Sequence, residues 1–370
     1  MTEASLNYVI DVLKGKISEY EPDWFETLGF LQMHRIAGLF YSKSKQLEIK
    51  LPAKINKALK DIFEKQKRRV LLLKEYVKEI SNELLASNVE HVFLKGSVFS
   101  NVKKNFNIYK LGERSSNDID ILVNQENISK VTNCLKKLGF VQGIYDEETK
   151  KIKEYSRLEI IIRRMNRGEV APFVKLTNNI EIPFVEVDIN FSLGNTPNDH
   201  VDLLNFMIDS RVISDKYFPL SRLDNELFFI HLLMHQYKET TLYFMIERNK
   251  DLDIYKLADI YYLFKNNKIK RNRVKDLAKK FNIEEQVGYV LFQVAEAFSD
   301  YELLKYAKRF GVSEQVIIDY ETKKKYRMYV SIRTRLKTFN SIKYLEEVRD
   351  KPFYRWEFPI DYFRGHNNDN

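Results

Sequence analysis

Residues 117–123 constrain the fold of this chain most strongly, because two aspartates alternate with isoleucines inside an otherwise apolar run. Successive side chains of a β-strand point to opposite faces of its sheet. Asp118 and Asp120 are therefore predicted to share one face, while Ile119 and Ile121 pack on the other. Two neighbouring carboxylates repel each other, which raises their pKa values or requires a cation. The pattern predicts a divalent metal site; the alternative is a strand end whose aspartates are solvated.

A second candidate element lies upstream, where the apolar run 92–94 is followed by Lys95, Gly96 and Ser97 and then by residues typical of a helix. Glycine lacks the Cβ that would block close backbone approach, and backbone N–H groups at a helix start favour phosphate. Gly96 and Ser97 are therefore candidate ligands for a triphosphate, and Lys95 is a candidate cation for it. The alternatives are an ordinary turn and a solvated lysine.

A third carboxylate follows downstream, in residues 182–191, where apolar and polar side chains alternate. This alternation predicts a half-buried strand. Asp188 on its polar face is a better candidate than Glu186 to approach Asp118 and Asp120, if the two strands are neighbours. Three acids could then hold two metal ions about 3.5–4 Å apart, as suits phosphoryl displacement. An amphipathic edge strand without function would show the same alternation.

Taken together, residues 94–97, Arg114, residues 117–123 and residues 187–188 resemble the DNA polymerase β-like nucleotidyltransferase superfamily. The resemblance is strongest to its bacterial branch of uncharacterised or putative nucleotidyltransferases. It implies an α+β fold, in which a mixed-sheet core like the polymerase β palm carries helical N-terminal and C-terminal regions. Arg114 stands at the family's arginine position, four residues before Asp118. It is a candidate nucleotide-binding cation or, alternatively, a salt bridge that orients the acidic cluster.

The resemblance also implies a mechanism. Asp118 and Asp120 would bind Mg²⁺ together with the nucleotide phosphates, and Asp188 would complete a second Mg²⁺ site and help to activate the acceptor. We therefore expect an enzyme that moves a nucleoside monophosphate from an NTP, such as ATP, to a hydroxyl of a small molecule or peptide, releasing pyrophosphate. The alternatives are transfer to RNA or protein, and a nucleotide-binding or toxin–antitoxin module without turnover.

Composition agrees with this expectation. A chain of 370 residues with 44% apolar content can bury a substantial core. It has no apolar run of membrane-spanning length and no secretory start, so a cytoplasmic protein without membrane contact is expected. Its single cysteine, Cys134, excludes an internal disulfide and a cysteine-based zinc site. The net charge of +9 is a weak indication of nucleic acid binding, because lysine is abundant throughout the chain. Residues 323–337, however, contain seven cations and no acid, and could attract nucleic acid or form a helix whose cations are solvated.

The periodicity predicts an N-terminal helical region over residues 1–88, a catalytic core over 89–194, a C-terminal helical domain over 195–364 and a disordered tail over 365–370. Residues 158–162 and 172–176 are typical of strands. Helices are expected over the following ranges: 52–87, 128–138, 225–237, 254–264, 274–281, 286–298 and 334–348.

His231 and His235 are four residues apart on the helix expected over 225–237, and therefore share one of its faces. Histidines at this spacing can bind zinc, but the glutamate of the metalloprotease motif is missing between them. They are interpreted as packing residues of the helical domain or, alternatively, as contacts in the acceptor pocket.

Overall fold

The chain forms two compact units, which the computed structural model describes separately. One unit comprises Met1–Arg68, Ile108–Ser115 and Leu232–Trp356, and the other contains Arg69–Asn107 and Ser116–His231. Helices α4 (Ala53–Ala86) and α9 (Asn225–Thr241) contribute residues to both. The structure describes the following residues: 1–101, 108–114, 116–194, 196–214, 218–241, 245, 251–266, 268–311, 316–318, 325–327 and 331–338.

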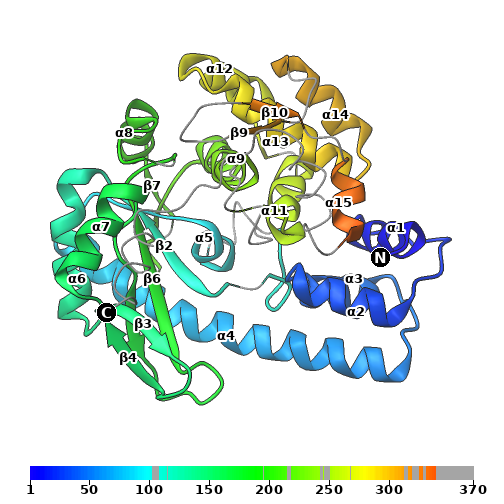
Figure 1. The fold of residues 1–370 in the computed structure, drawn as a ribbon, viewed down its shortest axis with the longest axis horizontal. Helices are drawn as coiled ribbons and strands as arrows, with labels where there is room; N and C mark the ends of the chain where they lie inside the picture. The colour runs from blue at the N-terminus through cyan, green and yellow to red at the C-terminus, as the bar shows by residue number, and fades with distance from the viewer. Residues whose placement is uncertain are drawn as a thin grey trace, which may run out of the picture. The chain divides into compact units, whose positions relative to one another are not determined.

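The second unit is built on an eight-stranded mixed sheet with the strand order β4-β3-β5-β6-β2-β1-β8-β7. Strands β2 and β6 are parallel neighbours near its middle (Figure 1), while β1 pairs with β2 in antiparallel fashion. The sheet confirms the predicted mixed α+β core. The strands are β1 (Val92–Phe93), β2 (Asp118–Leu122), β3 (Val141–Asp146), β4 (Lys151–Glu154), β5 (Phe173–Leu176), β6 (Phe184–Asn190), β7 (Val212–Ile213) and β8 (Ser221–Arg222).

Alternation of side chains explains why β2 and β6 belong at the centre. Ile119, Ile121, Val187 and Ile189 are at most 1% exposed, so one face of both strands is fully packed. Burial of this face fixes the register, because a slip of one residue would turn the aspartates into the core.

Helices of this unit cover the sheet and connect its strands. From Arg69 onward, α4 buries an apolar stripe that includes Leu73, Val77, Ile80 and Leu84, as the sequence predicted. Helix α6 ends before Gly139, whose φ of +83° is the left-handed conformation that glycine adopts readily. The remaining helices are α5 (Lys95–Asn101), the 3₁₀ turn η1 (Gln125–Asn127), α6 (Ile128–Lys137), α7 (Arg157–Arg167) and α8 (Val201–Asp209).

One sequence prediction in this unit is wrong. Residues 158–162 were expected to form a strand, but they lie in α7. The helix begins with a capping box, in which the Ser156 side chain accepts from the Glu159 N–H and the Glu159 side chain accepts from the Ser156 N–H. These bonds satisfy N–H groups at the start of the helix and outweigh the strand preference of the consecutive isoleucines.

The first unit is mainly helical, as expected for the N-terminal and C-terminal regions. Its core contains large side chains that are almost completely buried, such as Phe30, Phe40, Tyr289 and Phe298. None of the helices that the structure describes is both long enough and apolar enough to span a bilayer. The other elements are α1 (Glu3–Leu13), α2 (Trp24–Met33), α3 (Ala37–Gln46), α11 (Ile254–Lys265), α12 (Arg271–Lys280), α13 (Glu284–Ala297), α14 (Tyr301–Ala307), η2 (Lys308–Phe310), β9 (Val316–Ile318), β10 (Lys325–Arg327) and α15 (Ile332–Thr338).

The basic segment 323–337 does not form the single helix considered for it. Residues Lys325–Arg327 are the strand β10, which pairs with β9, and the helix α15 begins only at Ile332. Pairing between the backbones of the two strands satisfies hydrogen-bond groups that a helix would otherwise satisfy internally. The predicted helix 334–348 therefore corresponds to α15 up to Thr338, and its remainder and the tail 365–370 lie outside the described residues.

Candidate metal and nucleotide site

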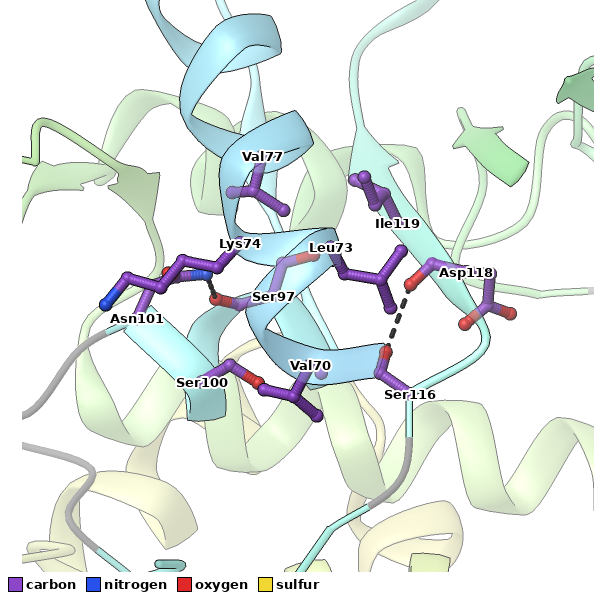
Figure 2. Close-up of a pocket in the computed structure, with 11 residues that line it drawn as sticks. Val70, Leu73, Lys74, Val77, Ser97, Ser100, Asn101, Ser116, Asp118 and Ile119 are labelled. Atoms are coloured by element: carbon purple, nitrogen blue, oxygen red, sulfur yellow. Dashed lines mark hydrogen bonds between the residues drawn. The ribbon is translucent and has the colours of Figure 1, made fainter. Parts of the chain in front are cut away.

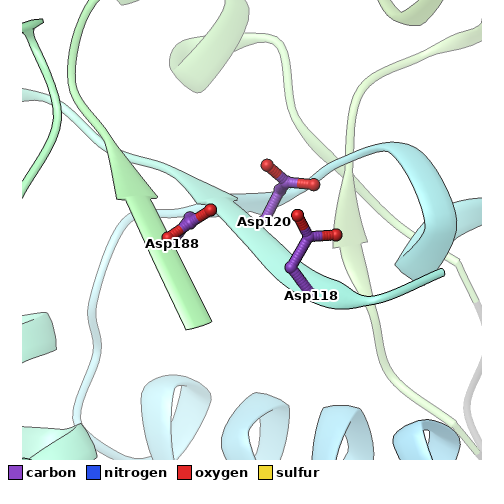
Figure 3. A group of neighbouring side chains, drawn as sticks. All are labelled: Asp118, Asp120 and Asp188. Atoms are coloured by element: carbon purple, nitrogen blue, oxygen red, sulfur yellow. The ribbon is translucent and has the colours of Figure 1, made fainter. Parts of the chain in front are cut away.

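The central feature of the sheet is a group of three aspartates on β2 and β6. Asp118 and Asp120 lie on β2, and Asp188 lies directly opposite Asp120 in the parallel ladder. Each carboxylate offers one oxygen, and these oxygens all lie within 4.8 Å of one another. Figure 3 shows the three side chains gathered over the two adjacent strands. The predicted convergence of three acids from distant parts of the chain is therefore present.

The surroundings of the aspartates keep much of the water away. Asp120 is only 3% exposed, while Asp118 and Asp188 are partly buried. Burial raises the pKa of Asp188 well above its usual range, and repulsion by Asp118 and Asp120 adds to this effect. Burial, and after it repulsion by Asp118 and Asp120, also raise the pKa of Glu186, which lies opposite Asp118. The site thus concentrates negative charge that a cation would stabilise.

The donor set fits a divalent metal ion. Three hard carboxylate oxygens at mutual distances within 4.8 Å match the ligands that Mg²⁺ and Mn²⁺ prefer. Nitrogen or sulphur ligands, which would favour zinc, do not belong to this group. Asp118, Asp120 and Asp188 are therefore the residues that would hold the ion.

A lysine lies beside the acidic cluster. The Nζ atom of Lys95 is 2.8 Å from Oδ1 of Asp120 and donates a hydrogen bond to it. Lys95 is the first residue of α5, directly after the short connection from β1. The structure therefore places this predicted cation at the predicted acids, although 24 residues separate Lys95 from Asp120 in the chain.

Gly96 and Ser97 follow in the first turn of α5 and line a small hollow. Its wall on the α4 side is formed by Val70, Leu73, Val77 and Lys74, and Asn101, which also lines it, donates to the Ser97 carbonyl oxygen. Figure 2 shows the Asp118 carboxylate turned away from the other residues that line the hollow. This hollow therefore lies behind the acidic face, as the alternation of β2 requires.

One residue of the site was missed in the sequence. The guanidinium of Arg69, on α4, donates from Nε to the Ser116 carbonyl oxygen and from Nη2 to the Asn117 carbonyl oxygen, both at 3.0 Å. Arg69 thereby holds the two residues that immediately precede Asp118. No spacing or motif links a helical arginine to a strand 49 residues later, so the sequence contains no signal for this contact.

Arg114 lies in the other unit, where its guanidinium forms a nearly buried ion pair with Asp259. Its Nε is 3.0 Å from both carboxylate oxygens and its Nη2 is 2.8 Å from Oδ2. Tyr109 donates to the same carboxylate. The ring of Tyr255 faces the guanidinium, with 5.2 Å between the Arg114 Cζ atom and the ring centre. Arg114 thus forms a salt bridge, but its acidic partner is Asp259 of its own unit rather than a residue of the acidic cluster, and its contact with the nucleotide stays a prediction.

The two histidines of α9 have different surroundings. His231 is 6% exposed and belongs to the interior. His235 is part of the other unit, where its Nε2 is 3.2 Å from Glu239, a residue that also pairs with Lys256. Among the described residues, neither histidine belongs to the group of potential metal ligands.

Hard oxygen donors on adjacent strands of a mixed sheet fit the class of proteins that handle phosphate esters with a divalent cation, as nucleotidyl transfer requires. Comparison with known families narrows this class. The model of a family described as uncharacterised nucleotidyltransferases matches residues 20–299. The chain therefore belongs to this family, which confirms the resemblance found in the sequence. No protein of curated function matches the chain.

Proposed function

We propose that the protein transfers a nucleoside monophosphate from an NTP to the hydroxyl of a small molecule or peptide, with Mg²⁺ as cofactor and pyrophosphate as second product. The observation that carries the proposal is the convergence of Asp118, Asp120 and Asp188 in a chain of this family. The acidic set by itself would fit any divalent cation, and family membership connects it with nucleotides.

The chemistry requires positioning and charge compensation more than covalent catalysis. The acceptor oxygen forms a bond to the α-phosphorus, while the bond from this phosphorus to the pyrophosphate oxygen breaks. The proton leaves the acceptor oxygen and passes to the carboxylate of Asp188. When bound by the three carboxylates, Mg²⁺ would neutralise charge on the triphosphate. Asp118 and Asp120 hold their positions because β2 is hydrogen-bonded on both sides within the sheet.

Lys95 is proposed to contact the phosphates, because its ammonium is already at the acidic cluster. For Gly96 and Ser97 this contact stays a prediction from the family pattern, since both residues are buried and line the hollow behind the acidic face. By contrast, we assign Arg114 and His235 to the stability of the first unit, since their contacts with Asp259 and Glu239 occupy them there.

Contacts of the basic segment favour a small acceptor over RNA. Arg333 and Lys337 each lie 2.7 Å from a carboxylate oxygen of Glu3, and Arg335 pairs with the buried Asp251. Two carboxylates of the same unit thus compensate most of the charge of these three cations, which lowers their attraction for nucleic acid phosphates. The net charge of the chain is therefore a poor argument for an RNA acceptor.

The test incubates the purified protein with each α-labelled NTP, Mg²⁺ and a low-molecular-weight cell extract as the source of acceptors. We expect label in a new small product, release of pyrophosphate, and loss of both with Asp118→Asn and Asp120→Asn. Asp209→Asn is the matched control, because this exposed residue at the end of α8 has the same chemistry away from the site. Binding of each NTP is measured by calorimetry in parallel, with Mg²⁺ and with EDTA.

Two results would argue against the proposal. NTP binding that needs no metal and survives both substitutions would indicate a nucleotide-binding module without turnover. Label that appears only in a ribonuclease-sensitive fraction, when total RNA is added, would assign the acceptor to RNA.

A further inference from the structure

The contact between Lys95 and Asp120 follows from the way the chain leaves β1. Phe93 pairs with Ile121 in the antiparallel ladder, and the Leu94 N–H donates to the Asp120 carbonyl oxygen at 3.0 Å. Lys95 then adopts a φ of +47°, in the left-handed region that lysine rarely occupies. A conformation of this kind is strained and persists where the surrounding structure requires it. Here it accompanies the contact of the Lys95 ammonium with the Asp120 carboxylate.

This ion pair differs from the structural ion pair of the other unit. Arg114 meets Asp259 through two nitrogens, and their side chains are 9% and 2% exposed. Lys95 contacts Asp120 through one nitrogen and keeps 20% of its side chain exposed. A lysine ammonium is a point charge on a flexible stem, whereas an arginine fork fixes its partner geometrically. Another ligand can therefore replace Lys95 at Asp120 more readily than it could replace Arg114 at Asp259.

We propose that Lys95 and the divalent cation compete for Asp120, so that metal binding displaces the Lys95 ammonium from this carboxylate to the phosphates of the NTP. This inference rests on the proposed function and adds that the metal binds tightly only together with the NTP. Metal alone displaces Lys95 from Asp120 but offers its ammonium no phosphate in exchange. Metal together with NTP offers the displaced ammonium a new anionic partner.

The displacement needs only a small movement. Magnesium binds oxygen at about 2.0–2.1 Å, so a phosphate oxygen on the same ion lies within about 4 Å of the carboxylate oxygen. The four-carbon stem of lysine spans such a distance by rotation about its single bonds. The backbone of β1, β2 and α5 can stay as it is.

Competition of this kind couples the two ligands. Each should strengthen the binding of the other by the same factor, because coupling free energies are reciprocal. The protein would then bind free metal weakly and the metal–nucleotide complex tightly.

The experiment measures two affinities in three variants and the wild type. Mn²⁺ binding is followed by electron paramagnetic resonance without nucleotide. Binding of ATP, GTP, CTP and UTP is then measured by calorimetry in saturating Mn²⁺. The variants are Lys95→Met, Lys95→Gly and, as the control for net charge, Lys151→Met on the exposed edge strand β4. Lys95→Gly also removes the backbone strain, so a folding defect in Lys95→Met can be distinguished from a binding effect.

We expect opposite changes in the two affinities. Both Lys95 variants should bind Mn²⁺ alone about tenfold more tightly, which corresponds to ~1.4 kcal/mol. They should bind the preferred NTP about tenfold more weakly. Lys151→Met should match the wild type in both affinities.

Other outcomes overturn the inference separately from the proposed function. An unchanged Mn²⁺ affinity would show that Lys95 does not compete with metal. A loss of both affinities in both Lys95 variants would show that it only supports the local structure. Tighter Mn²⁺ with unchanged NTP affinity would show that it never reaches the phosphates. If the wild type binds no NTP in saturating Mn²⁺, the proposed function itself fails.

Discussion

Asp120 and Asp188 are directly opposite each other in the parallel ladder between β2 and β6. Neighbouring residues in a ladder have side chains on the same face, which brings the two carboxylates together. The arrangement is electrostatically unfavourable without a cation, and it combines residues that are far apart in the sequence. The acidic site therefore lowers the stability of the folded chain, as is common for residues kept for function.

Asp188→Asn tests whether the acidic site destabilises the folded chain. Burial and the repulsion by Asp118 and Asp120 raise the pKa of Asp188, so its charged form is less favourable in the folded than in the unfolded chain. Such a group favours folding below its unfolded pKa, and this contribution is lost as the pH rises through its higher folded pKa. In EDTA at neutral pH, Asp188→Asn should therefore raise the free energy of unfolding.

The same variant should lose the stabilisation that Mg²⁺ gives to the wild type, and its metal affinity should fall at least about tenfold, because one oxygen ligand loses its charge. Denaturation curves with EDTA and with Mg²⁺ measure both effects. Asp209→Asn, at the exposed end of α8, serves as the control and should show neither. A variant that is less stable than the wild type in EDTA would contradict this account of the site.

A pH-dependent stability is expected from His34 in the first unit. Burial lowers the pKa of His34 to about 3, well below its unfolded value, and the His34 ring stacks edge-on against Phe30. The unfolded chain therefore binds a proton that the folded chain does not. Stability from this group is complete above about pH 6.5 and declines as the pH falls, by ~2 kcal/mol at pH 5.

Denaturant unfolding of the wild type and of His34→Gln between pH 5 and 6.5 tests this expectation. The variant should be less stable at pH 7, because the buried site loses its packing, but its stability should depend less on pH in this interval. If the free energy of unfolding depends on pH in the same way in both proteins, His34 does not cause the acid sensitivity.

The acidic face of β2 and β6 could be predicted because strand alternation depends only on local sequence. Asp118 and Asp120 alternate with Ile119 and Ile121, and Asp188 stands in the same kind of pattern. The register that places Asp188 opposite Asp120 could not be predicted, since it depends on which strands become neighbours. Only the family resemblance indicated that these two strands are neighbours.

Other features of the fold were not predicted from the sequence, and the reasons can be identified. Residues 158–162 have an apolar run that fits a strand or a helix, and the deciding signal was the Ser156 and Glu159 capping pattern, which was present in the sequence but overlooked. Strand β8 has two residues, too few for any periodicity, and its place in the sheet depends on its pairing with β1 and β7. The partner of Arg114 is Asp259, and no motif connects these two positions.

The ion pair of Arg114 and Asp259 leads to a third prediction. Removing one member of a buried pair leaves an uncompensated charge and costs about 3–5 kcal/mol. Arg114→Met and Asp259→Asn should therefore each destabilise the first unit strongly, while the double variant should cost less than the sum of the two. Chemical denaturation of the four proteins gives the coupling free energy. Weaker NTP binding by Arg114→Met at unchanged stability would instead assign Arg114 to the nucleotide.

The last prediction concerns Arg69, which we interpret as a positioning residue for Asp118. Its two hydrogen bonds, to the carbonyl oxygens of Ser116 and Asn117, fix the backbone just before β2. Hydrogen bonds from a charged donor contribute about 1.5–3 kcal/mol each, so Arg69→Met should loosen this segment. We expect faster amide exchange at Asn117 and Asp118 and an affinity for Mn²⁺ that falls several-fold.

Two further variants separate positioning from charge. Arg69→Lys keeps the charge but cannot reach both carbonyl oxygens with a planar fork, so it should restore only part of the affinity. Lys78→Met, on the exposed side of α4, removes a cation without touching the segment and should leave exchange and metal binding unchanged. Full recovery of Mn²⁺ affinity in Arg69→Lys would show that the positive charge matters and the geometry does not, because only the charge is common to the two side chains.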